Sequence, residues 1–387
     1  MKTKGVIISL TVGLGLTLAL LWALAVEPVP LANADATSGT RIQLPALDTD
    51  TEGGWETRIQ VQNVGDEGTW AVVIYWGAYW GLCPPDDPGP LTTWDKQWLP
   101  LNGVWTVTPT DTARSAIVLS FAAEPTAQPD ETTLPTGEPL AVTVKRTGPG
   151  DADPDASVTS AYNGLSEDME GAGPPYKYFA PHIMYGHNGL TSTITIQNSG
   201  DQCTPVWIYY KEEGNCELQV AQHIEDLAPG EAVRVGPGGD IPFPGTLPPE
   251  WQLGSAYISA LVPLGIIVDQ VGNDMLMTHA GVPYEDASSL VNYAPLIFRE
   301  YNGWETNITV QNLTTESVCA EVKVDFLDNS GNIINTVVDW VCWTGSKTFT
   351  LPVVDDLTGT TWGRRGWSRR ITMTTALMLA RKIFSLW

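Results

Sequence analysis

Basic residues are scarce in this sequence of 387 residues: lysine and arginine total 20, whereas aspartate and glutamate total 44. The formal net charge is therefore −24 at pH 7. Because binding to nucleic-acid phosphates depends on Lys and Arg, this charge excludes a nucleic-acid partner, and it also disfavours an anionic lipid surface. An acidic surface of this kind usually keeps an exported protein soluble. The alternative is a surface that attracts cations.

Local signatures of catalysis and of metal binding are also missing. The five cysteines form no C-x-x-C pair, so a zinc site is not indicated. No G-x-S-x-G, H-E-x-x-H or glycine-rich phosphate loop occurs. His182 and His187 have a spacing that fits neither a strand face nor a helix face. Counting does not exclude a glycosidase-like carboxylate pair, but nothing local singles one out. We therefore predict a protein that is not an enzyme and has no cofactor.

Long apolar runs are absent except for one uncharged stretch from Val6 to Val26. It follows a basic start and precedes Ala-Asn-Ala-Asp-Ala at 32–36, which is the pattern of a signal peptide. We predict that residues 1–36 are this signal, with cleavage after Ala34 or two residues later. Because the stretch is long enough to cross a bilayer, the alternative is an uncleaved anchor helix as the only membrane contact. In both cases the rest is predicted to be extracellular or on the cell surface.

Glycine and proline, in contrast, are abundant, with 37 and 29 residues. They separate short apolar runs, and three of these runs match one another. Each match begins with glycine, ends in Gln-Asn and follows a proline at nearly constant distance. The three segments are Gly54–Asn63 after Pro45, Gly189–Asn198 after Pro181, and Gly303–Asn312 after Pro295.

Each matching segment alternates apolar and polar residues, as a half-buried strand does. In the third copy Trp304, Thr306, Ile308 and Val310 share one face. Further short strands follow at intervals of about ten residues, with turn sequences between them, which is typical of a β-sandwich. We predict an all-β chain with one sandwich in each of 40–175, 176–290 and 291–387.

The proline entry, the Gly-Trp-x-Thr-x-Ile-x-Val-Gln-Asn motif and the Asp-x-x-Gly-Asn turn between strands resemble tandem modules of large bacterial extracellular proteins. The resemblance covers most of residues 40–355. It implies immunoglobulin-like or related antiparallel β-sandwiches and an extracellular location, and it carries no catalytic residues. The first copy departs from the pattern after Trp76 with a Trp- and Pro-rich insertion, and the second has Leu190 in place of the motif tryptophan.

The last residues differ in charge from the rest of the chain. Residues 362–387 contain six basic residues and neither Asp nor Glu. This inversion predicts that the frame is broken or truncated here, and that the third module ends short, without its closing strands. The alternative is a basic amphipathic tail over 371–387 that touches a membrane.

Tryptophans of the first copy are the main candidates for a binding surface. Trp76 is in phase with apolar neighbours and is predicted to be buried. Trp80, Trp94 and Trp98 flank the insertion and are predicted to be exposed. Exposed flat aromatic rings can stack on sugars or anchor a partner protein, so a cell-surface glycan or protein is the predicted partner.

A D-x-D-x-D run at Asp151, Asp153 and Asp155 is the candidate metal site. Alternating carboxylates in a loop can chelate Ca²⁺. Ala156 and Tyr162, however, stand where an EF-hand needs Gly and Glu. The alternative is a solvated acidic linker.

The cysteines suggest disulfide bonds. Cys203 and Cys216 flank one region of the second copy, and Cys319 and Cys342 flank the equivalent region of the third. We predict one bridge within each of these copies, with Cys83 left over. The alternative is that the cysteines are reduced and buried as small apolar residues.

Together these features predict a non-enzymatic, structural or adhesive protein of β-sandwich repeats. The alternatives are a carbohydrate- or protein-binding module that acts through the Trp-rich first copy, and an accessory protein of an extracellular hydrolase.

Overall fold

The computed structural model describes most of the chain after residue 37. The described residues are 38–49, 54–77, 83, 91–110, 112–129, 133–150, 157–166, 174–217, 220–237, 239–245, 247, 251–272, 274–284, 291–294, 304–315, 317–327, 332–349, 369–373 and 376–384. The predicted signal or anchor helix lies outside them. Within them the secondary structure is strand, so the all-β prediction is confirmed. No helix in these ranges has the length and apolar character that a membrane span requires.

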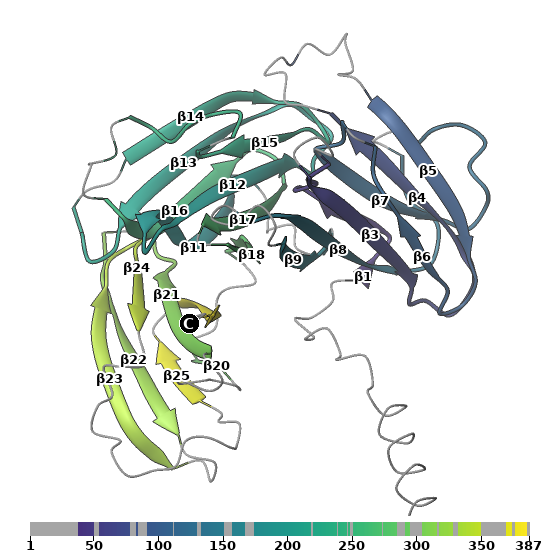
Figure 1. Ribbon diagram of the computed structural model, residues 1–387. Coiled ribbons are helices and arrows are strands. Elements are labelled where there is room, and N and C mark those ends of the chain that lie inside the picture. Colours follow the sequence, from purple (N-terminus) through teal and green to yellow (C-terminus); the bar gives the residue numbers. More distant parts are fainter. Residues whose placement is uncertain are drawn as a thin grey trace, which may run out of the picture. The chain divides into compact units, whose positions relative to one another are not determined.

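The first copy forms two five-stranded antiparallel sheets (Figure 1). One contains β1, β8, β3, β6 and β9, and the other contains β10, β2, β7, β4 and β5. The strands are β1 (Ser38–Gly39), β2 (Arg41–Leu44), β3 (Glu56–Asn63), β4 (Thr69–Trp76), β5 (Leu91–Leu99), β6 (Val104–Val107), β7 (Ser115–Phe121), β8 (Leu140–Pro149), β9 (Ser157–Asn163) and β10 (Leu165–Ser166). One cluster of fully buried apolar side chains unites residues of both sheets, such as Val73 of β4 and Val144 of β8.

The second copy repeats this plan in a nine-stranded sheet. Its strands are β11 (Tyr176–His187), β12 (Leu190–Asn198), β13 (Thr204–Glu212), β14 (Val220–Leu227), β15 (Ala232–Val235), β16 (Leu253–Ala260), β17 (Leu264–Gly272), β18 (Met275–Ala280) and β19 (Val282–Pro283). β11 pairs with β16 over most of its length and with β12 at its end, so it joins the two groups of strands. The β11–β16 register shifts at the entry Pro181, whose nitrogen has no hydrogen to donate to the ladder.

The third copy has a four-stranded and a three-stranded sheet. Its strands are β20 (Val291–Ala294), β21 (Trp304–Asn312), β22 (Ala320–Leu327), β23 (Ile333–Val341), β24 (Ser346–Phe349), β25 (Arg369–Met373) and β26 (Ala376–Phe384). β25 pairs with β22 and with β20, and β26 pairs with β21 along its whole length. The prediction that this copy lacks its closing strands is therefore wrong at the level of the backbone. Backbone pairing does not depend on the sign of the side-chain charge, which was the basis of that prediction.

All three copies share one strand order. Counted from β2, β11 and β20, the first, sixth, third and fourth strands are neighbours, and so are the fifth, second and seventh. The second–fifth and third–sixth pairs also occur in the immunoglobulin order. The first and seventh strands differ from that order. Here the first strand pairs with the sixth and the seventh pairs with the second. In the immunoglobulin order the first strand is instead in the sheet of the second, and the seventh is in the sheet of the sixth.

The outward face of the motif strand differs between copies. On β3 the outward residues are exposed, and Arg58 and Glu56 form an ion pair of 2.7 Å there. On β12, in contrast, the outward Thr195 and Gln197 are buried, and Ile267 of the neighbouring β17 packs into the first copy's core cluster. The face is therefore covered where another copy precedes it.

Candidate functional site

The conserved feature of the three copies is the asparagine that ends the motif strand, and it is fully buried each time. Asn198 Nδ2 donates to the carbonyl of Leu227, at the end of the fourth strand, and to Gln202 in the next turn, both at 2.8 Å. Its Oδ1 accepts the N–H of Gly200 at 2.8 Å. Asn63 and Asn312 make the equivalent bonds. The motif asparagine therefore fixes the turn at this end of every module.

The motif glutamine connects successive copies. Gln197 Nε2 donates to the carbonyl of Ala116 in the first copy at 3.2 Å and to Gly230 in its own copy at 3.0 Å. Gln311 Nε2 does the same one junction later, with Ala256 in the second copy at 3.2 Å and Thr344 in its own at 2.9 Å. Both glutamines are fully buried, whereas Gln62 of the first copy is exposed.

A serine in the sixth strand of the preceding copy donates a hydrogen bond to the following copy at each junction. Ser115 Oγ donates to the carbonyl of Gly230, and Ser255 Oγ donates to that of Thr344, each at 2.9 Å. The accepting residues occupy the same turn position, and both have a positive φ, 75° at Gly230 and 52° at Thr344. Asn102 has this conformation at the matching position of the first copy, with φ 58°. The same turn thus aims its carbonyl at the preceding module in both junctions.

One tryptophan packs at each junction, but from opposite sides. In the first junction a side chain at Gly230 would collide with the ring of Trp76, so only glycine fits there. In the second junction Lys211 occupies the position of Trp76, and its Nζ lies 3.5 Å from the ring centroid of Trp343 in the next copy. The tryptophan thus comes from the preceding copy at the first junction and from the following copy at the second.

Removal of the junction glutamine is the first test of this arrangement. We expect Gln197→Ala to lower the free energy of unfolding by about 2 kcal/mol, because it removes two buried hydrogen bonds, to the carbonyls of Ala116 and Gly230. The matched Gln62→Ala is expected to change it by less than about 0.5 kcal/mol, because that side chain is in water. Urea titration followed by tryptophan fluorescence measures both. Equal effects of the two substitutions would contradict the role of Gln197 as a connector.

Disulfide bonds also join successive copies. Cys83 bonds with Cys203 (Cα–Cα 6.1 Å), and Cys216 bonds with Cys342 (Cα–Cα 5.1 Å). Cys319 is free and exposed. The predicted pairing within each copy is therefore wrong. Cys203 and Cys216 lie at opposite ends of β13, whose nine residues place them about 30 Å apart.

Three of these cysteines gather at the second junction. The sulfur atoms of Cys216, Cys319 and Cys342 lie within 4.8 Å of one another. Among the described residues, this is the only group of His, Cys, Asp or Glu side chains close enough to hold a metal ion together.

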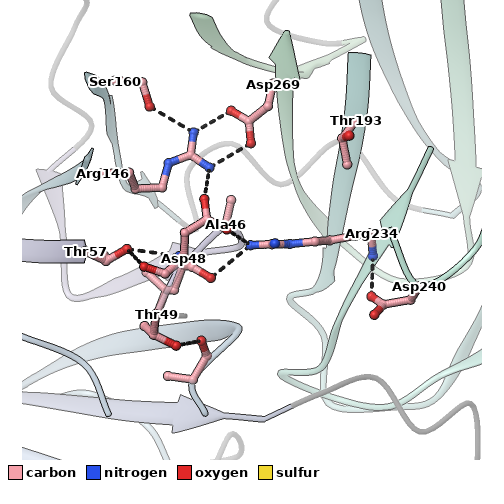
Figure 2. A network of polar contacts seen from close by, with 12 residues as sticks. Ala46, Asp48, Thr49, Thr57, Arg146, Ser160, Thr193, Arg234, Asp240 and Asp269 are labelled. Carbon is pink, nitrogen blue, oxygen red and sulfur yellow. Dashed lines mark hydrogen bonds and ion pairs between the residues drawn. The ribbon is translucent and has the colours of Figure 1, made fainter. Parts of the chain in front are cut away.

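A buried charge network links the first two copies (Figure 2). The guanidinium of Arg146, on β8, is fully buried and bonds both carboxylate oxygens of Asp269 on β17, with Nη1 at 2.7 Å from Oδ2. Its Nη1 also donates to Asp48 at 3.1 Å. Arg234, on β15, donates to the other oxygen of Asp48 and to the carbonyl of Leu47 at 2.9 Å. Two cations and two anions therefore neutralise one another between the modules.

The pKa values in this network follow from burial and charge. Burial alone would raise the pKa of Asp48, but the charges of Arg234 and Arg146 outweigh it and hold this pKa below its ordinary value of 3.8. Burial would likewise lower the pKa of Arg146. The charge and hydrogen bonds of Asp269 outweigh that effect and raise it. Both groups are thus kept in their charged forms.

The tryptophans that the sequence singled out in the first copy differ in their exposure to solvent. Trp76 is buried, as predicted. Trp98, on the edge strand β5, is 40% exposed, and its ring lies edge-on to Trp70 with 5.8 Å between centroids. Trp94 is half-buried under Lys96, whose Nζ lies 5.3 Å from its ring centroid. Trp80 lies outside the described residues. A ligand for these rings stays a prediction.

The candidate calcium ligands Asp151, Asp153 and Asp155 also lie outside the described residues. The sequence reasoning did not single out Arg146, Asp48, Asp269 or the two connecting glutamines. The signal for Arg146 is its phase on β8, because it shares a face with the buried Val144.

Comparison with known proteins gives no assignment. No family model, no curated protein and no solved structure matches this chain.

Proposed function

We propose that this chain is an exported, non-enzymatic structural protein of the cell surface or extracellular space. Its modules are β-sandwiches related to the immunoglobulin-like type, and their role is to hold successive modules in a fixed arrangement. The loops at the module ends are then presented to partners, as is usual for repeated β domains.

The observation that carries the proposal is the repeated junction. The same Gln–carbonyl and Ser–carbonyl bonds occur at both junctions, each together with a disulfide between copies. A chain whose modules moved freely against each other would have no reason to bury these polar groups and crosslink them. Disulfides persist mainly in oxidising compartments, which supports a location outside the cytoplasm. The net charge of −24 favours solubility there.

Export and crosslinking can be tested together. Produced in a bacterial host, the full chain is expected outside the cytoplasm with Cys83 and Cys203 joined. A chain without residues 1–36 is expected to stay inside with reduced thiols. Cell fractionation, alkylation of free thiols and non-reducing electrophoresis measure both properties. A full chain that stays in the cytoplasm with five reactive thiols would overturn the proposal.

The full-length Cys203→Ala variant is the matched control. It is expected in the same fraction as the full chain but without the mobility shift of the crosslinked form. This separates the effect of location from that of the disulfide.

A further inference from the structure

The two inter-module disulfides start from the same place in the repeat. Cys83 lies in the loop after β4, the third strand of the first copy, and Cys216 lies in the loop after β13, the third strand of the second. At the first junction the partner is Cys203, which directly precedes the third strand of the next copy.

Applied to the second junction, this rule names Cys319. Cys319 directly precedes β22, the third strand of the third copy, as Cys203 directly precedes β13. Its sulfur lies 3.9 Å from that of Cys216. In the structure, however, Cys216 is bonded to Cys342.

Cys342 has no counterpart in the other two copies. It follows Val341, whose carbonyl accepts from the motif asparagine of the third copy. The residues at the same place in the other copies are Ala228, after Leu227, and Pro100, after Leu99. The second junction thus carries the repeat's own cysteine pair and one additional thiol within reach of it.

We propose that the second junction carries an exchangeable disulfide, in which Cys216 bonds alternately with Cys319 and Cys342. In the exchange the Cys319 thiolate attacks the sulfur of Cys216, the Cys216–Cys342 bond breaks, and its electron pair leaves with Cys342. The proton that Cys319 lost is taken up by Cys342. No oxidant or reductant is consumed, because one disulfide and one thiol are present before and after.

The surroundings of the three sulfur atoms suit this exchange. Cys319 is exposed and Cys342 is buried, so the two states differ in which thiol meets solvent. The Lys211 amine donates to the carbonyl of Cys216 at 3.0 Å and is itself buried. Burial lowers the pKa of Lys211 to about 8, against an opposing effect from the charge of Cys319. The Lys211 side chain therefore lies next to Cys216, the residue that both disulfides share.

Disulfide mapping of the purified, oxidised full chain tests the proposal. Samples are quenched with acid, alkylated with N-ethylmaleimide and digested without reductant. We expect two linked peptides that contain Cys216, one with Cys319 and one with Cys342. Cys83 is expected with Cys203 alone, which serves as the internal control. Detection of just one linked peptide that contains Cys216 would overturn the proposal.

Two single variants make the test independent of the equilibrium between the states. In Cys342→Ala the Cys216–Cys319 peptide is expected to account for all of Cys216, and in Cys319→Ala the Cys216–Cys342 peptide is expected to do so. Alkylation of both Cys216 and Cys319 in Cys342→Ala would contradict the exchange. Zn²⁺ retained through dialysis by the untreated chain, with these three thiols reduced, would make the cluster a metal site and would equally overturn it. The mapping uses purified protein, so its outcome does not depend on where the chain is located.

Discussion

The Arg146→Met variant is expected to lose about 3–5 kcal/mol of unfolding free energy, the cost of removing one partner from a buried ion pair. The side chain of Arg146 is fully buried, and it is the main partner of Asp269 and one of two cationic partners of Asp48. Without the guanidinium, the carboxylate of Asp269 keeps the hydrogen bond that the hydroxyl of Thr278 donates, at 2.7 Å. Differential scanning calorimetry of the full chain measures the loss.

Arg58→Met is the matched control, because Arg58 lies on the neighbouring β3 and also pairs with an acid. Its ion pair with Glu56 is open to solvent, with side-chain exposures of 60% and 49%. Exposed pairs contribute about 0–1 kcal/mol, so little change is expected. Adding Asp269→Leu to Arg146→Met is expected to recover part of the loss, because the buried charge is then removed. A double variant no more stable than Arg146→Met would show that packing of the long side chain, not charge, accounts for the effect.

The same network gives a pH dependence with a definite sign. The pKa of Asp48 is lower in the folded chain than its ordinary value of 3.8. Its stabilising effect is therefore fully present above the unfolded pKa and is lost as the pH falls through the lower, folded one. The wild-type chain should lose stability steeply below about pH 4. Asp48→Asn should be less stable than the wild type at neutral pH, and its unfolding free energy should fall less steeply as the pH is lowered below about 4.

Strand positions could be predicted from the sequence because alternation is a local signal. The motif strand β3 alternates exposed and buried residues along its length, as its sequence does. The closing strands β25 and β26 were missed because the prediction gave the sign of the charge more weight than the continuous apolar run Ala-Leu-Met-Leu. Both strands pair through backbone hydrogen bonds, which do not depend on the sign of the side-chain charges.

Contacts between modules could not be predicted in the same way, because they join residues far apart in the sequence. Arg146 and Asp269 are 123 positions apart, and no local motif links them. Two local signals were nevertheless available. Arg146 falls in phase with Val144 on a buried strand face, where an unpaired charge is very unfavourable. The outward face of the motif strand changes from Arg58 and Glu56 in the first copy to threonines in the second, as expected when the face becomes covered.

The disulfide pairing was missed because proximity in sequence was taken as proximity in space. A strand separates its two ends by its full length, so cysteines on either side of β13 cannot meet. The pattern that would have found the partner of Cys83 at the first junction is the recurrence itself. A cysteine follows the third strand in the first two copies, and a cysteine precedes it in the last two. Such an offset between successive copies indicates bonds that run from one copy to the next.

Loss of the Cys83–Cys203 bond is the second large effect that we expect. The bond closes a loop with a sequence separation of 120, for which chain entropy in the unfolded state gives a stabilisation of about 4–5 kcal/mol. Cys83→Ala and Cys203→Ala should each lower the unfolding free energy by this amount. Calorimetry under oxidising conditions measures the change. The junction hydrogen bonds of Gln197 and Ser115 remain, so the variants should still fold.

Non-additivity distinguishes the bond from the packing of its sulfur atoms. If the crosslink accounts for the effect, the Cys83→Ala/Cys203→Ala double variant loses no more stability than either single variant. Cys319→Ala, at the position that matches Cys203 one copy later, should leave the first junction unchanged. If the two single losses instead add in the double variant, each cysteine acts through its own contacts and the first junction is held by hydrogen bonds and charge. The fixed arrangement of these two modules would then rest on Arg146, Asp48 and Asp269, whose removal should separate them even with all cysteines in place.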